Sequence, residues 1–174
     1  DQFFQTLGEE GKSILIKEAD EIVSGNVRIF GELTPLDFTH AQPLHHWTFY
    51  ETSHELRITN YFPHNDIKFL WEPARFGWAF TLGRAYHLTQ DSKYAEAFWK
   101  YFESFTESNP ANIGPHWMNG QEVAIRLMAF VWCAHVFANT QHVDTKTRKH
   151  VNTQLHASRE RSRRDATRNT QLLT

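Results

Sequence analysis

Apolar positions at helical spacing are the main pattern along this chain. In residues 9–25, apolar side chains recur every three or four positions, and Gly25 follows as a C-terminal stop. Residues 88–110 show the clearest helix, because Asp91 suits an N-cap and a stripe of aromatic side chains follows it on one face. That stripe consists of Tyr94, Phe98, Tyr101, Phe102 and Phe105. Both segments predict amphipathic helices.

Two further helices are predicted around these. One runs from Pro73, which suits a first helical turn, to about Leu88. The other, within residues 121–140, is apolar nearly all round, which predicts an inner helix covered by its neighbours. Residues 26–66 carry several Gly and Pro among many aromatics and predict a long, ordered loop. Nothing indicates a strand-based fold, so we expect an all-α protein of antiparallel helical hairpins.

Composition adds an excess of aromatic side chains. The 14 Phe, 6 Trp and 5 Tyr make up 14% of the chain, enough to fill a core and also to line a groove for ring-shaped ligands. Cys133 is the single cysteine, so no intrachain disulfide can form, and we expect an inert core thiol. The eleven His are scattered, and no ligand set requires a metal. We therefore expect neither metal nor cofactor.

Charge is distributed unevenly. Between Lys146 and Arg168 lie eight Lys or Arg against only Glu160 and Asp165. This basic stretch lacks interleaved aromatics, so we expect residues 158–174 to be a solvated, poorly ordered tail and not a nucleic-acid site. No apolar run approaches the length of a membrane span, and the chain begins without a signal segment. We expect no membrane partner.

Two motifs carry a resemblance to a known family. "DIKFLWEPARFGWAFTLGRAYHL", from residue 66, contains Trp-Glu-x-x-Arg, and "HWMNGQEVAIRLMAF", from residue 116, contains Trp-x-x-x-x-Glu-x-x-x-Arg. Together, at this separation, they make the chain similar to the N-terminal helical domain of the heparinase II/III polysaccharide lyases. The resemblance covers roughly residues 15–140.

The resemblance implies a partial, incomplete α/α toroid over residues 1–157, whose cleft binds an acidic polysaccharide containing uronic acid, such as heparin, heparan sulfate or alginate. Lyases of this kind cleave by β-elimination, in which one group neutralises the uronate carboxylate, a base removes the adjacent proton and an acid protonates the leaving oxygen. The expected substrate-binding residues come from both motifs and the loop between them: Trp71, Glu72, Arg75, His116, Trp117, Asn119, Gln121, Glu122 and Arg126.

The catalytic segment of the family departs from its pattern here. The family carries Asn-Asn-His-Leu-Leu-Thr, and this chain reads "RNTQLLT", with Thr170 and Gln171 in place of the second Asn and the His. Asn169 is thus the one catalytic candidate, and whether this chain is itself an enzyme stays open. We expect a fragment of a longer lyase. The alternative is a non-catalytic helical carbohydrate-binding or scaffold module.

Several structural readings compete with these functional ones. Glu122 and Arg126 lie one helical turn apart and could simply pair with each other, and Glu72 with Arg75 could be an ion pair at a helix start. A glycoside hydrolase would need a second carboxylate beside Glu122, and none is evident. Full-length members of the family imply a periplasmic or secreted location, although a cytoplasmic one stays open. An incomplete toroid would also expose apolar helix faces, through which the chain could self-associate.

Overall fold

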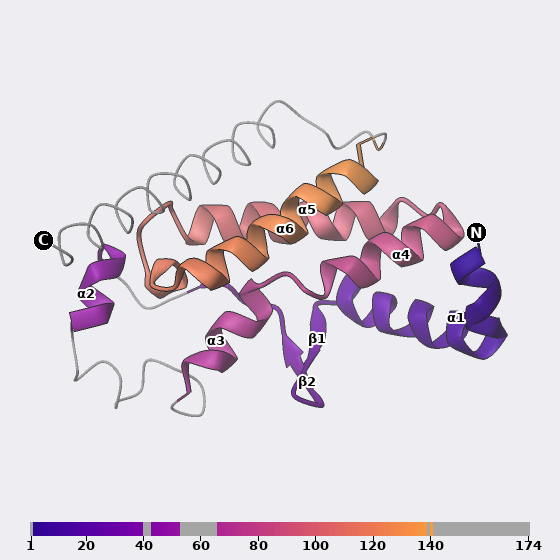
Figure 1. The fold of residues 1–174 in the computed structure, drawn as a ribbon, viewed down its shortest axis with the longest axis horizontal. Helices are drawn as coiled ribbons and strands as arrows, with labels where there is room; N and C mark the ends of the chain where they lie inside the picture. The colour runs from indigo at the N-terminus through magenta and orange to yellow at the C-terminus, as the bar shows by residue number, and fades with distance from the viewer. Residues whose placement is uncertain (1, 40–42, 53–65, 139, 141–174) are drawn as a thin grey trace, which may run out of the picture.

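The computed structural model describes residues 2–39, 43–52, 66–138 and 140, and these residues are mainly helical (Figure 1). The predictions for residues 158–174 and for Asn169 concern residues outside this described part. In chain order the elements are α1 Gln2–Val23, β1 Asn26–Ile29, β2 Glu32–Pro35, α2 Trp47–Thr52, α3 Ile67–Ala74, α4 Ala79–Thr89, α5 Lys93–Ser108, the 3-10 turn η3 Pro115–Trp117 and α6 Gly120–Val136. The predicted all-α class is confirmed.

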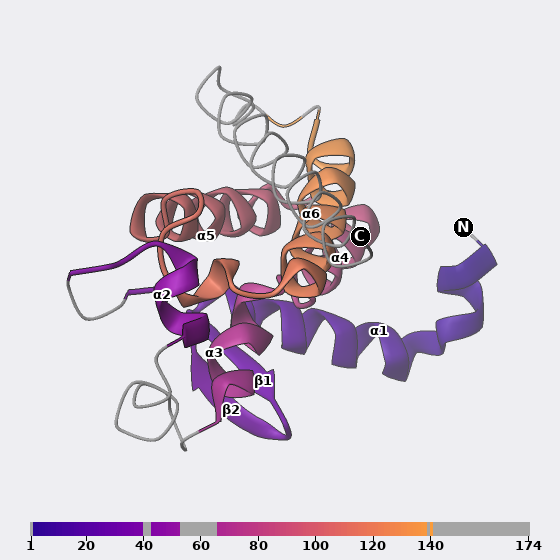
Figure 2. The same cartoon turned by 60° about the vertical axis from the view of Figure 1, so that its left-hand side comes forward.

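Helix α4 is the central element of the helical layer. It packs against α1, α5 and α6 (Figure 2). A short connection makes α4 and α5 a hairpin, whereas the longer connection from α5 to α6 contains η3, and α6 packs on α4. This helical packing is that expected of a partial toroid. The prediction that α6 is covered on most sides is wrong for this arrangement, because Met128 is 61% and Val131 51% exposed.

The loop predicted over residues 26–66 contains a β-hairpin that the sequence analysis missed. Strands β1 and β2 pair antiparallel, with Ile29 opposite Glu32, so only two residues form the turn. Those two residues, Phe30 and Gly31, have φ values of 51° and 90°, as a type I′ turn requires. The apolar alternation is weak because Val27 and Ile29 alone face the core. The helix α2 also lies in this region.

The single helix predicted from Pro73 to Leu88 is two helices. Asp66 caps α3 by accepting the backbone N–H of Lys68 at 2.9 Å, so the helix starts earlier and Pro73 falls near its end. The chain then breaks at Phe76, whose φ is 59°. This left-handed conformation is unfavourable for a bulky side chain. The indole of Trp78 donates to the Pro73 carbonyl at 2.9 Å and holds the break in place.

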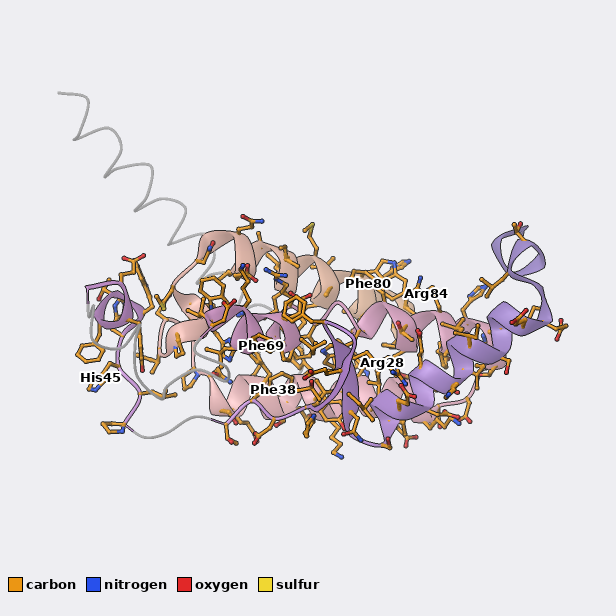
Figure 3. The ribbon with its side chains drawn as sticks, turned by 90° about the horizontal axis from the view of Figure 1, so that it is seen from below. Arg28, Phe38, His45, Phe69, Phe80 and Arg84 are labelled. Atoms are coloured by element: carbon orange, nitrogen blue, oxygen red, sulfur yellow. The ribbon has the colours of Figure 1, made fainter. Side chains whose placement is uncertain are left out.

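Burial of Phe76 explains how that backbone conformation persists. Its ring is fully buried and lies 4.7 Å from Phe130, 5.4 Å from Phe38 and 5.5 Å from Phe105, measured between ring centroids. Phe38, labelled in Figure 3, follows β2 and packs on Phe76 and Phe105. The predicted stripe on α5 is confirmed, because all five of its aromatic side chains are buried: Tyr94, Phe98, Tyr101, Phe102 and Phe105. One aromatic core therefore joins α3, α5 and α6.

Close packing between α4 and α6 makes Gly83 a sensitive position. A Cβ built there would lie 2.3 and 2.4 Å from two ring carbons of Trp132. We predict that Gly83→Ala lowers the free energy of unfolding by about 1–3 kcal/mol, because the ring must move within a packed interface. Urea denaturation measures this change. Gly77→Ala is the control, since no atom lies within 4 Å of its added Cβ. Equal midpoints for the two variants would contradict the packing described.

Candidate functional site

The two motif segments meet where α3, η3 and α6 come together. Helix α3 and helix α6 both contact η3, and local signals position each one. Gly114, at φ 96°, turns the chain into Pro115, and Asn119 caps α6 by accepting the backbone N–H of Gln121 at 2.8 Å. Asn109, fully buried, donates to the carbonyl of Phe38 and fixes the start of this connection. We refer to this meeting point as the motif junction.

Arg75 bridges the two motifs. Its Nε and Nη2 donate to the two carboxylate oxygens of Glu122 at 2.6 and 2.7 Å, and its Nη1 donates to Glu72. The hydrogen bonds and the charge of Glu122 raise the pKa of Arg75, with Glu72 adding to the effect. The Glu72–Arg75 pair expected at a helix start is present, but it lies at the end of α3, because that helix already begins at Ile67. Glu72 and Glu122 share the guanidinium of Arg75. A second carboxylate therefore does lie near Glu122, although none was evident from the sequence.

Arg126 serves a different partner from the one expected. Its Nε donates to the carbonyl of Ala74 at 2.7 Å and its Nη2 to that of His116 at 3.1 Å, so its hydrogen bonds go to backbone and not to Glu122. Its guanidinium also lies 4.5 Å from the Phe105 ring centre and 5.6 Å from that of Trp117. Arg126 thus ties the end of α3 to η3.

Burial dominates the electrostatics of Arg126. The residue is 1% exposed, and desolvation lowers its pKa to about 9, while the charge of Glu122 acts in the opposite direction. The side chain therefore keeps its charge at neutral pH. Its Nη1 has no hydrogen-bond partner among the described residues, a state that is unfavourable for a buried donor. The guanidinium is held by two carbonyls, two aromatic faces and the nearby carboxylate.

The indoles of the two motifs are held in different ways. Trp71 donates its Nε1–H to the carbonyl of Pro115 at 3.2 Å, which adds another link between α3 and η3. Trp117 is 1% exposed and packs with Val123, and its Nε1 has no hydrogen-bond partner among the described residues. Trp71 is half-buried and presents part of its ring to solvent. Stacking on a sugar ring is therefore open to Trp71 and closed to Trp117 in this arrangement.

The nine predicted site residues separate into two sets by exposure. Glu72 and Arg75 keep 31% and 29% of their side chains exposed, whereas Glu122 keeps 5%. The accessible set is Trp71, Glu72, Arg75, Asn119 and Gln121, and the buried set is His116, Trp117, Glu122 and Arg126. The structure brings all nine to the motif junction or its border. Substrate contact itself stays a prediction.

Sequence reasoning missed Lys68 and Trp47. Lys68 is exposed and lies seven residues before Arg75 and three before Trp71, which places it on the same face of α3; this spacing was the available signal. Trp47 begins α2 and packs beside Trp117. Its backbone N–H donates to the carbonyl of Asn112 at 3.0 Å, which places α2 next to η3. Lys68 adds a cation near the junction, and Trp47 extends its aromatic border.

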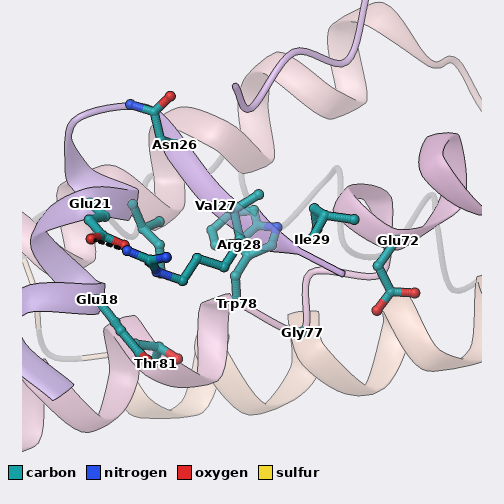
Figure 4. Close-up of a pocket in the computed structure, with 11 residues that line it drawn as sticks. Glu18, Glu21, Asn26, Val27, Arg28, Ile29, Glu72, Gly77, Trp78 and Thr81 are labelled. Atoms are coloured by element: carbon teal, nitrogen blue, oxygen red, sulfur yellow. Dashed lines mark hydrogen bonds and ion pairs between the residues drawn. The ribbon is translucent and has the colours of Figure 1, made fainter. Parts of the chain in front are cut away.

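A pocket of about 270 Å³ lies on the other side of Glu72, between α1, β1 and the start of α4 (Figure 4). Glu18, Glu21 and Glu72 line it, together with Arg28 and Trp78. Arg28 donates to Glu21 at 2.9 and 2.7 Å, an interaction that lowers the pKa of Glu21 and raises that of Arg28. Three carboxylates against one guanidinium make the pocket unfavourable for a uronate carboxylate.

Two other kinds of site, a membrane span and a metal site, are not found within the described ranges. No helix there combines the length and apolarity that crossing a membrane requires. No group of three or more His, Cys, Asp or Glu in the same ranges could hold a metal ion.

The described part of the chain is a helical module in which one Arg–carboxylate cluster joins the two motif segments. The family model for the heparinase II/III N-terminus matches residues 26–160. The chain belongs to this family, and both signature motifs lie inside the matched region. Neither a comparison with curated proteins nor one with solved structures found a match.

The Arg75–Glu122 pair provides a test of the junction. A double-mutant cycle with Arg75→Ala and Glu122→Ala measures the coupling, which we predict to be about 2 kcal/mol in the free energy of unfolding, because Glu122 is buried and the contact is bidentate. The Arg28–Glu21 pair has the same bidentate form but is exposed. Its coupling, measured alongside, should be smaller. Equal couplings would show that burial adds nothing at the junction.

Proposed function

We propose that this chain is part of a polysaccharide lyase that acts on an acidic polysaccharide containing uronic acid by β-elimination, and that it supplies residues of the substrate cleft. The observation that carries the proposal is the interlocking of the two family motifs. Arg75 joins Glu122, Trp71 joins Pro115, and Arg126 joins Ala74. Such a junction presents Trp71, Glu72 and Arg75 on rigid elements, as a binding surface requires.

The accessible residues match the chemistry of such a ligand. Trp71 offers an aromatic face for a sugar ring, Asn119 and Gln121 offer amides for hydroxyl groups, and Lys68 offers an exposed cation for a carboxylate or sulfate. Arg75 is already paired with two carboxylates, so it orders the surface more than it adds positive charge. His116, Trp117, Glu122 and Arg126 would need the junction to open before touching a ligand, so we assign them a positioning role.

The catalytic groups are a separate part of the proposal. Asn169 remains the candidate for neutralising the uronate carboxylate, by donating an amide N–H to it. The alternative function, a non-catalytic carbohydrate-binding or scaffold module, uses the same surface without this step. We further propose a periplasmic or secreted location, where such polysaccharides are found. The exposed Ile14, Met128 and Val131 support self-association through apolar helix faces.

An elimination assay tests the lyase function directly. Incubation with heparin, heparan sulfate and alginate should produce unsaturated products with ultraviolet absorbance if this chain carries out the chemistry. Binding of one of these polysaccharides without product would favour the non-catalytic module. Neither binding nor product would contradict both functions.

Binding to the proposed surface can be tested through Lys68. We predict that Lys68→Ala weakens binding of an acidic oligosaccharide about fivefold, since one exposed ion pair contributes up to about 1 kcal/mol. Isothermal titration calorimetry at low salt measures the affinity. Lys100→Ala is the matched control, because Lys100 is equally exposed but lies on α5. Equal effects of the two substitutions would place the ligand elsewhere.

A further inference from the structure

The outward side of α5 carries a group of carboxylates that the motif junction does not use. Glu96, Glu103 and Glu107 lie at i, i+7 and i+11 on one side of the helix, and all three are exposed. Lys100 is the cation among them. They border a surface hollow of about 340 Å³, which Trp99 also lines. We call this surface the α5 acidic face.

The indole of Trp99 lines the hollow at this face. Its side chain is 3% exposed, yet its Nε1 has no acceptor among the described residues. Its ring packs on Phe98 at 4.7 Å and Phe102 at 5.7 Å, both on α5 itself. A buried indole N–H without an acceptor is unfavourable. The face therefore suits an occupant that brings cations and hydrogen-bond acceptors together, as a basic polypeptide segment does.

The C-terminal end of α6 lies close to the α5 acidic face, and a basic segment follows it in the sequence. Phe137 ends α6 and lies 5.5 Å from Phe98, the neighbour of Trp99, measured between ring centroids. The described structure ends at Thr140, a few residues further on. Eight Lys or Arg against two acidic residues follow between positions 146 and 168. Six extended residues span up to about 20 Å, and the carboxylates from Glu96 to Glu107 span about 16 Å of helix, so the segment can reach the whole face.

We propose that the basic segment, residues 146–168, docks on the α5 acidic face of its own chain. Its guanidinium and ammonium groups pair with Glu96, Glu103 and Glu107, and an oxygen of the segment accepts the Trp99 N–H. An acidic polysaccharide is a poor occupant of this face, because its charge has the same sign. The docking uses no residue of the motif junction, so it can be tested apart from the substrate surface proposed there.

Limited trypsin digestion of the full chain tests the docking, because the segment is rich in cleavage sites. The variant E96Q/E103Q/E107Q should raise the initial rate of cleavage between positions 146 and 168 at least about fivefold at low salt. The control E10Q/E32Q/E51Q removes the same charge from exposed positions away from α5 and should leave that rate unchanged. Cleavage after Arg126, which is buried, reports unfolding.

A salt titration of the unsubstituted chain decides the question without any variant. About 0.5 M NaCl should accelerate cleavage of the segment while cleavage after Arg126 stays slow, since screening weakens exposed ion pairs. Cleavage that is equally fast at low and high salt, or equally fast in the variant and its control, would overturn the docking. Protection that rises with protein concentration would also overturn it, because the occupant would then be a second copy.

Discussion

The arrangement of the helices around the candidate site depends on one guanidinium held between two carboxylates. Arg75 comes from the end of α3, Glu72 from the same helix one turn earlier and Glu122 from the first turn of α6. Charge-assisted bidentate contacts have narrow geometry, so the pair fixes the angle and the register between the two helices. Arg126 adds two further links at the same junction by donating to the carbonyls of Ala74 and His116.

The aromatic core makes this polar junction possible. The break between α3 and α4 places Phe76 in a left-handed conformation, and contacts with Phe38, Phe105 and Phe130 hold the ring there. That break turns α3 away from α4 and directs Arg75 towards α6. Phe105 also covers the face of Arg126. Core packing and motif geometry are therefore coupled. The core holds the helix break at Phe76, and Phe105 of the core packs against Arg126 of the second motif.

The sequence predicted those parts of the molecule whose signals are local and periodic. The helix before Gly25 and the aromatic stripe of α5 follow from spacing and capping residues, and α6 follows from its long apolar run. The hairpin was missed because two inward residues on β1 are too few for a period-two pattern, and the turn places a bulky Phe30 at positive φ. The packing of Phe76 on Phe130 and the hydrogen bond from Arg126 to Ala74 join residues more than 40 positions apart, which no local pattern contains.

The two family motifs form one structural unit around Arg126 and Arg75. Hydrogen exchange of the Arg126→Met variant, followed by mass spectrometry, measures whether the two motifs depend on each other. We predict that amide exchange rises together in residues 67–76 and in residues 113–118, because both lose their common hydrogen-bond donor, while α5 keeps its protection. Exchange that rises in only one of the two segments, or equally across α5, would show that the two motifs do not form one unit.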